Sequence, residues 1–259
     1  MKLKILSSNI RFSNPADGVH NWEARMPLLV KLYQDFKPDI LGTQEGRIGQ
    51  LKELDDALPE LVLVDSHRNW IDERMYPCLF VNPKTVKVEK SGDIWLSETP
   101  HTPGSSSFQS MFPRLCTWAD VTFLENGHQM IIINTHLDHV KSETRQQQIE
   151  VLIKEIKSQS SREVIIMGDF NESPTTALQD TLVKSFNLKD PWKEKKLPEE
   201  TSHHSFLGDK MPEGDRIDWI LIPKSFSCED IRLVKTTSAE GLFPSDHYPL
   251  LATVSDTHS

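Results

Sequence analysis

Residues 163–171 read Glu-Val-Ile-Ile-Met-Gly-Asp-Phe-Asn. The apolar run from Glu163 to Gly168 predicts a buried strand that ends in the polar residues Asp169 and Asn171. If the strand continues that far, both polar side chains project to the same side, because side chains alternate along a strand with a period of two. One such ending says little, since Asp and Asn are ordinary turn residues and can also cap a helix, here one beginning near Pro174.

Four other strand-like segments end in the same way. Asn, Glu, Asp and His recur in these endings, and they are the residue types that bind a hard divalent cation through oxygen and transfer protons. Polar residues at the ends of strands are also where α/β proteins place their ligand sites. The four endings are Ser8-Asn9, Gln44-Glu45, Asn134-Thr135-His136-Leu137-Asp138 and Ser245-Asp246-His247.

The rest of the chain alternates between strand and helix patterns. Apolar residues at helical spacing predict helices over 22–36, with Asn21 as N-cap, over 48–58 and over 142–156. Asn126-Gly127 lies between two strand patterns and is a strong hairpin signal. Further strands are expected over 2–8, 39–43, 78–81, 86–96, 115–123, 129–135 and 216–222, and loops over 98–107 and 198–214. Hairpins mixed with helices favour mixed sheets covered by helices, in the α/β or α+β class.

Composition limits the classes of protein. The chain has 259 residues, 37% of them hydrophobic, and a formal net charge of −9. That charge weighs against tight, sequence-blind binding to long nucleic acid, although a few local basic residues can still hold one scissile phosphate. The start of the chain turns polar at Ser7, too soon for a signal peptide or a membrane span. Cys78, Cys116 and Cys228 are scattered and are expected to be reduced, buried thiols. We expect a monomeric, cytoplasmic protein.

The order of the polar motifs is more specific than any one of them. Together with Arg216-Ile217-Asp218-Trp219-Ile220, they resemble the successive signatures of the endonuclease/exonuclease/phosphatase superfamily, which includes deoxyribonuclease I. The motifs in question are Thr43-Gln44-Glu45, Asn134-Thr135-His136-Leu137, Gly168-Asp169-Phe170-Asn171 and Ser245-Asp246-His247. The run from Gly92 to Pro100, with Pro103-Gly104-Ser105 after it, is similar to a branch of mostly uncharacterised bacterial hydrolases.

The resemblance implies one domain over residues 1–259, built as a four-layer αββα sandwich with two central mixed sheets. It also implies a metal site for Mg²⁺, with Mn²⁺ as a substitute. Glu45 would be the main metal ligand, with Asn9 close by. Asp246 is the third residue expected at the metal site.

The remaining implied roles concern the reaction. Asp169 would orient or deprotonate the attacking water, and Asn171 would hold the scissile phosphate. His136 and His247 would bracket that phosphate and stabilise charge in the transition state. The other roles are supporting: Asp218 would hold His247, Glu73 would hold His136, and Arg114 would face the phosphate.

Three functions remain open from the sequence. The leading hypothesis is a phosphodiesterase acting on nucleic acid or a nucleotide-like substrate. The second is a phosphatase or phosphodiesterase of a small sugar or inositol phosphate or a phospholipid head group, which the net charge mildly favours. The third, a non-catalytic binding module, is disfavoured because every expected site residue type is present. Some residues have either a site role or a purely structural one: Asp138, His139, Arg145, His203, His204 and the loop Glu98 to Phe108.

Overall fold

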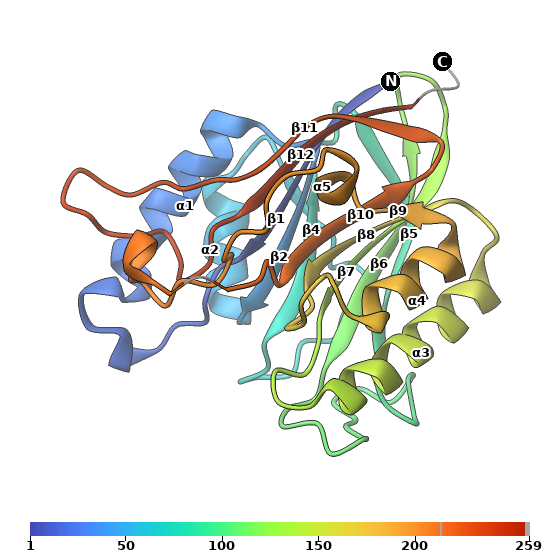
Figure 1. The fold of residues 1–259 in the computed structure, drawn as a ribbon, viewed down its shortest axis with the longest axis horizontal. Helices are drawn as coiled ribbons and strands as arrows, with labels where there is room; N and C mark the ends of the chain where they lie inside the picture. Colours follow the sequence, from blue (N-terminus) through green and yellow to red (C-terminus); the bar gives the residue numbers. More distant parts are fainter. Residues whose placement is uncertain (213, 257–259) are drawn as a thin grey trace.

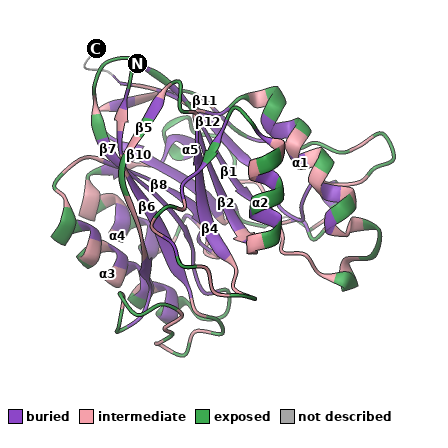
Figure 2. Ribbon diagram, turned by 180° about the vertical axis from the view of Figure 1, so that it is seen from behind, coloured by how far each residue is buried: buried purple, intermediate pink, exposed green. Residues whose placement is uncertain are grey.

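The computed structural model describes residues 1–212 and 214–256. Two six-stranded mixed sheets lie face to face, and helices cover the outer face of each (Figure 1). Figure 2 shows the strands as the buried interior, with exposed surface on the outer sides of the helices. The expected α/β class and the four-layer sandwich are therefore confirmed.

Each sheet is built around a parallel pair of strands joined by a helix. In the first sheet, β1 (Lys2–Asn9), α1 (Trp22–Phe36) and β2 (Ile40–Gly46) form this unit. In the second sheet, β7 (Gln129–His136), α3 (Ser142–Gln159) and β8 (Val164–Asp169) form it. Asn21 caps α1 as expected, because its side chain accepts a hydrogen bond of 2.9 Å from the backbone N–H of Ala24.

Antiparallel strands flank both parallel pairs. The first sheet runs β11-β12-β1-β2-β4-β3 and the second runs β5-β6-β7-β8-β10-β9. A strand antiparallel to its neighbour begins where that neighbour ends, so β12, β4, β6 and β10 all begin at the carboxyl ends of the parallel pairs. The flanking strands are β3 (Val62–Leu63), β4 (Tyr76–Val81), β5 (Val86–Trp95), β6 (Leu115–Phe123), β9 (Leu188–Lys189), β10 (Asp218–Pro223), β11 (Phe226–Leu233) and β12 (Leu250–Asp256).

Helices on the two sides bury separate apolar clusters. On one side α1 and α2 (Ile48–Ala57) pack on the first sheet, and on the other α3 and α4 (Ala177–Phe186) pack on the second (Figure 1). A third cluster fills the space between the sheets. The short elements are η1 (Pro15–His20), α5 (Pro191–Glu194) and η2 (Gly208–Lys210).

The alternation of side chains along the central strands decides which residues face the space between the sheets. In β8, Ile165 and Met167 face that space, whereas Val164 and Ile166 face the helices. Asp169 has the same parity as Ile165 and Met167, so it projects into the end of the space between the sheets. The same parity rule applies to Asn9 in β1, His136 in β7 and Asp218 in β10.

The expected strands and helices are confirmed, with boundaries shifted by a few residues at most. The sequence did not predict β11 and β12 near the end of the chain or the two-residue strands β3 and β9. The helix expected near Pro174 begins at Ala177, and its N-cap is Thr176 rather than Asp169 or Asn171. The loop expected over 198–214 contains η2, and residue 213 lies outside the described part of the chain. All three cysteines are buried and free. Within the described ranges, no helix combines the length and the hydropathy that crossing a membrane requires.

Candidate active site

The polar strand ends converge on one cavity of about 230 Å³ at one end of the two sheets. Seven of the ten predicted site residues line it. Asn9 and Asp218 lie directly behind them, hydrogen-bonded to Asp169 and to His247 respectively. The seven lining residues are Glu45, Arg114, His136, Asp169, Asn171, Asp246 and His247.

Asn9 joins the two sheets at the floor of the cavity. Its side-chain amide lies 3.2 Å from an oxygen of Glu45 and 2.9 Å from an oxygen of Asp169. The second Glu45 oxygen accepts a hydrogen bond of 3.1 Å from the backbone N–H of Phe12. Two carboxylates, one from each sheet, thus converge on one amide group, and this oxygen-rich set suits a hard divalent cation.

A β-bulge aims Glu45 into the cavity. Regular alternation would send Glu45 to the helix side, because its neighbour Gln44 faces the other sheet and donates to Asn134 at 2.7 Å. The β2–β4 register slips between Thr43 and Gly46, and Glu45 adopts a left-handed conformation with φ of 67°. Bulges of this kind re-aim side chains beside functional sites. Sequence periodicity alone does not reveal this feature.

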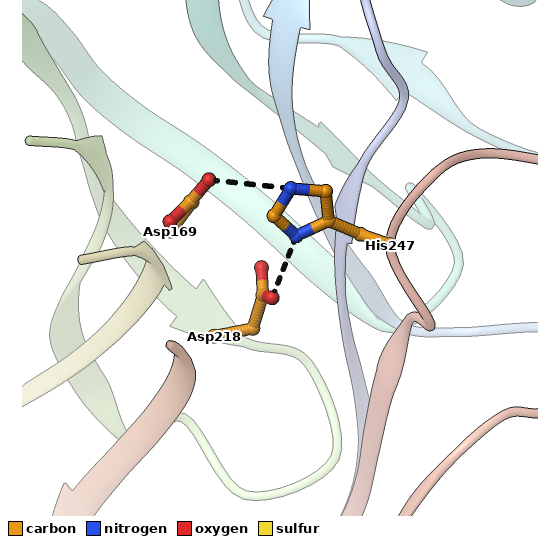
Figure 3. Close-up of side chains that lie close together, drawn as sticks. All are labelled: Asp169, Asp218 and His247. Atoms are coloured by element: carbon orange, nitrogen blue, oxygen red, sulfur yellow. Dashed lines mark hydrogen bonds and ion pairs between the residues drawn. The ribbon is translucent and has the colours of Figure 1, made fainter. Parts of the chain in front are cut away.

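His247 lies between two buried carboxylates (Figure 3). Its Nδ1 is 2.9 Å from Asp218 and its Nε2 is 3.8 Å from Asp169. Burial lowers the pKa of His247, but the charge and hydrogen bond of Asp218, with Asp169 and Asp246, outweigh burial and raise the pKa to about 10. The imidazole is therefore a cation at neutral pH, as predicted from the acid beside it.

The surroundings of Asp169 raise the pKa of its carboxylate, as suits a general base. Burial, followed by the negative charge of Asp218, raises the pKa of Asp169 to about 6, against the opposing charge of His247. Asp169, Asp218 and His247 present ligand atoms within 4.8 Å of one another, a spacing that could hold a metal ion. However, a protonated imidazole has no lone pair for a metal, so this trio suits proton transfer better than metal binding.

His136 differs from His247 in its surroundings. Burial, then the charges of Arg114 and His247, lower the pKa of His136 well below its ordinary value. Its Nε2 lies 3.5 Å from Asp169, but this contact does not offset the two cations. The expectation that an adjacent acid keeps both histidines charged is therefore wrong for His136, which is a neutral hydrogen-bonding group.

Glu73 does not lie where the resemblance put it. Its side chain is 84% exposed and pairs with Arg47 at 3.3 Å, and no contact joins it to His136 among the described residues. Glu73 has a left-handed backbone conformation in the loop before β4. The strand pattern does not place a side chain in this loop, because no strand register constrains it. Within the described residues, Glu73 is therefore a partner of Arg47 and not of His136.

Asn171 reaches the cavity by a different route from the predicted one. Strand β8 ends at Asp169, and Asn171 takes a left-handed conformation with φ of 50°. Its backbone N–H donates to Asp169 at 3.0 Å and its side-chain amide donates to the carbonyl of Leu137 at 3.1 Å. A turn, rather than a continued strand, therefore places Asn171 beside Asp169.

Glycine at position 168 permits the close approach of β7 and β8 at the site. Gly168 has φ of 146°, and a Cβ there would lie 2.0 Å from the carbonyl oxygen of Thr135. His136 and Asp169 are paired in register in the next step of the same ladder. The glycine before Asp169 therefore sets the distance between the two strand ends.

Arg114 is a buried guanidinium at the cavity wall. Its Nη2 lies 3.2 Å from Nδ1 of His139, and its Nε has no hydrogen-bond partner within the described part of the chain. Burial lowers the pKa of Arg114, although Glu45, Asp169 and Asp138 oppose this. A buried cation with unused donors is suited to an anion entering the cavity.

Asp246 lies on another wall of the cavity. Its carboxylate is 3.6 Å from Arg11 and 3.8 Å from His203. Burial raises the pKa of Asp246, but His203, His247 and Arg11 outweigh burial and hold it below its ordinary value. The structure thus pairs Asp246 with Arg11 and His203, and within the described residues Asp246 forms no hydrogen bond or ion pair with Asn9 or Glu45.

Several lining residues were not predicted. They come from loops rather than from strand ends, so no strand pattern signals them. The unpredicted residues are Arg11, Phe12, Met75, Phe112 and Ile217.

His139 and His203, whose roles the sequence left open, line the cavity, whereas buried His204 does not. Arg145 does not line the cavity; its side chain is buried and donates to Glu172 at 2.7 Å.

Solved structures with a similar fold cover nearly the whole chain. An endonuclease/exonuclease/phosphatase of Bacteroides vulgatus has 27% sequence identity and a TM-score of 0.89, with 99% of each chain covered. A mannosyl-6-phosphatase of Bacteroides thetaiotaomicron has 27% identity and a TM-score of 0.86, with 98% of this chain and 99% of that one covered. An uncharacterised protein of Acanthamoeba polyphaga mimivirus is 25% identical over 210 residues, which are 73% of this chain and 76% of that protein.

The model of the Endonuclease/Exonuclease/phosphatase family matches residues 6–247. This range contains every polar strand end that forms the cavity. The chain therefore belongs to the Endonuclease/Exonuclease/phosphatase family of phosphoester hydrolases.

Proposed function

We propose that this protein is a magnesium-dependent hydrolase of small phosphate esters, with sugar phosphates as the leading substrate class. One observation carries the proposal: a single cavity combines a carboxylate pair from the two sheets, a charged His247 and the buried, incompletely paired Arg114. These groups correspond to what phosphoester hydrolysis requires, namely a metal site, a base and charge stabilisation.

The size of the cavity and the charge of the chain favour a small substrate over nucleic acid, which was the leading hypothesis from the sequence. About 230 Å³ suits a compact ligand, and the net charge of −9 disfavours long polyanions. The similar mannosyl-6-phosphatase, by its name, acts on a phosphorylated sugar. A sugar phosphate is consistent with all three observations.

Glu45 would hold the magnesium ion with Asn9 beside it, since the side-chain amide of Asn9 lies on the cavity floor between Glu45 and Asp169. The bound ion would offset the negative charge that develops on the phosphoryl oxygens. Asp169 would take a proton from the attacking water, and protonated His247, held by Asp218, would stabilise charge on the phosphoryl group. Arg114 and neutral His136 would donate hydrogen bonds to the phosphate, with Asn171 beside them.

A second candidate is a nucleotide phosphodiester. Phe112 lines the cavity and is 43% exposed, so its ring offers a flat surface at the cavity mouth. Aromatic rings stack on nucleobases without strong sequence preference. The same face can also pack against a sugar ring, so Phe112 alone does not separate the two candidates.

A substrate panel tests the proposal. The purified protein is assayed with Mg²⁺ against mannose 6-phosphate, an inositol monophosphate, bis(p-nitrophenyl) phosphate and a single-stranded oligonucleotide. We expect the highest kcat/KM on a sugar or inositol phosphate, and loss of turnover after EDTA that added Mg²⁺ restores. Preference for the oligonucleotide would establish the nucleotide candidate instead, and undiminished turnover in EDTA would exclude the metal role.

A further inference from the structure

Asp138 is a fully buried carboxylate next to the cavity but not in its lining. It follows strand β7 and the predicted His136. One oxygen accepts hydrogen bonds from the backbone N–H groups of Val140 at 2.8 Å and Lys141 at 3.0 Å. The other accepts from the backbone N–H of Met111 at 2.9 Å. One side chain thus fixes two segments that are almost thirty residues apart in sequence.

The two segments carry one wall of the cavity. Met111 precedes Phe112 and Arg114, and Val140 follows His139. His139 contacts both Arg114 and Phe112. Its Nδ1 lies 3.2 Å from Nη2 of Arg114, and its ring stacks on that of Phe112 with centroids 5.9 Å apart and planes 17° apart. We call Phe112, Arg114 and His139 the cationic-aromatic wall.

The contacts of the wall define its chemistry. Because Nδ1 of His139 accepts from Arg114, the ring proton of neutral His139 lies on Nε2, where it can donate to a ligand. Burial, then the charge of Arg114, lower the pKa of His139, which favours this neutral form. The wall therefore offers hydrogen-bond donors to an anion and a flat apolar face to a ring.

The loop from Glu98 to Phe108, whose role the sequence left open, lies outside the cavity lining. Residues 98–108, all of them described, contribute nothing to the lining of the cavity. Two of their hydroxyl groups bond within the loop: that of Ser105 donates to the carbonyl of Thr99 at 2.9 Å, and that of Ser107 accepts from the backbone N–H of Glu98 at 3.1 Å. The carbonyl of Phe108 accepts from Thr144 of α3 at 2.7 Å. The substrate-facing part of this connection is the segment after it, which Asp138 holds.

We propose that Asp138 is a positioning residue that sets the cationic-aromatic wall, and that this wall binds the phosphate through Arg114 and the ring of a sugar phosphate against Phe112. The choice of a sugar ring rests on the proposed function, whereas the anion-binding part does not. Asp138 acts through the backbone of residues 111 and 140–141 and touches no substrate.

The test uses the neutral variant Asp138→Asn in the full-length protein. An amide group matches the carboxylate in shape, but its nitrogen cannot accept from a backbone N–H, so one of the two segments loses its bond. Asp39→Asn is the matched control, because Asp39 also accepts from a backbone N–H, that of Lys4 at 2.8 Å, and precedes β2 at the end away from the cavity. The readouts are the affinity for inorganic phosphate in Mg²⁺, amide hydrogen exchange, and KM and kcat on the best ester.

We expect Asp138→Asn to weaken phosphate binding by about tenfold, the effect of losing one hydrogen bond to a charged group. Amide exchange at 111 or at 140–141 should accelerate, KM should rise by a similar factor, and kcat should change little. Adding Arg114→Ala to Asp138→Asn should weaken binding little beyond Arg114→Ala alone. Asp39→Asn should leave phosphate affinity unchanged.

Other outcomes separate the possible failures. A lower melting temperature with unchanged phosphate affinity would overturn the proposal and leave Asp138 as a purely structural residue. If Asp138→Asn does not fold, the same measurements are made on Asp138→Ser. The serine hydroxyl can accept from the backbone N–H of Val140 but is too short to reach that of Met111. Wild-type phosphate affinity in Asp138→Ser would also overturn the proposal. So would a wild-type protein that does not bind phosphate. Phosphate binding that depends on Asp138 without turnover of any sugar phosphate would contradict only the proposed function.

Discussion

Two buried arginines, Arg68 and Arg114, have opposite surroundings. Every nitrogen of the Arg68 guanidinium has a partner at 2.7 Å: both oxygens of Asp93, the hydroxyl of Thr117 and the sulfur of Cys78. Arg114 has one partner, His139, and its Nε has none within the described ranges. Both side chains are almost inaccessible to water.

The difference distinguishes a structural ion pair from a binding group. Arg68 connects Cys78 of the first sheet with Asp93 and Thr117 of the second, so its bonds hold the sandwich together. Burial lowers the pKa of Arg68, but Cys78 and Asp93 outweigh burial and raise it. Arg114 lies at the cavity with unused donors, an arrangement that costs stability unless an anion binds. The degree of pairing, rather than burial, therefore indicates which arginine serves the ligand.

The largest expected effect is on folding, from Arg68→Ala. This change leaves Asp93 buried without its main partner, which typically costs about 3–5 kcal/mol of the free energy of unfolding. Urea denaturation measures the loss. Lys84→Ala, which removes an exposed ion pair, is the control and should change stability little. A loss in Arg68→Ala no greater than in the control would refute the structural role.

Arg114→Ala should have the opposite profile. No buried carboxylate loses its only partner, so the melting temperature should stay near that of the wild type. Activity should fall by roughly 10²–10³-fold, the usual cost of removing one donor that stabilises charge in the transition state. Kinetics on the best ester and thermal melting measure the two effects. Unfolding comparable to that of Arg68→Ala would show that the two arginines do not differ in the way described.

The pairing of Asp218 with His247 predicts a coupled pair. Asp218→Asn alone should reduce kcat, because His247 loses its closest acid and part of its charge. In a His247→Ala background the same change should cost no more than about twofold, since Asp218 then has nothing to orient. A double-mutant cycle measures this coupling, and multiplying losses would show that the residues act independently.

The smallest effect concerns acid stability at the Arg68 cluster. Burial raises the pKa of Asp93, but Arg68 and His67 outweigh burial and lower it from 3.8 to about 2. Because the folded-state pKa is depressed, the stabilisation is fully present above pH 3.8 and is lost as the pH falls through 2. It amounts to roughly 2 kcal/mol. The difference in the free energy of unfolding between wild type and Asp93→Asn should become smaller as the pH falls from 3.8 to 2. A difference that does not change with pH would show that Arg68 does not lower the pKa of Asp93.

Polar strand ends and the order of the motifs indicated many of the residues that line the cavity. Asp169, His136 and Asn9 were grouped as polar strand ends, and the structure shows that each has the parity that faces the space between the sheets. The period of two paired Asp169 with Asn171 and His136 with Asp138, but a turn places Asn171 and Asp138 does not line the cavity. The sheet topology places Arg114 and Asp218 beside the polar strand ends, because the antiparallel strands β6 and β10 begin at the end of the sheet where β7 and β8 end. Glu45 also lies in the cavity, but through a bulge that reverses its parity.

Loops account for what the sequence did not reveal. Glu73 and Asn171 both have left-handed backbones, which periodicity cannot anticipate for residues other than glycine. Phe12, Met75 and Phe112 line the cavity because loops distant in sequence meet there, and the Asp138 contacts that fix one of them involve backbone N–H groups with no sequence signature. Predicting such positions requires the assembled fold.

The most direct test of the whole account is the rate of phosphate release by Asp169→Asn from the best ester, in saturating Mg²⁺, beside the wild type. The amide retains the shape of Asp169 but cannot accept a proton from water. We predict a fall in kcat of at least about a hundredfold, as for the loss of a general base, with an unchanged melting temperature. Equal rates for the two proteins would show that the cavity at the end of the two sheets is not where the phosphoester is hydrolysed.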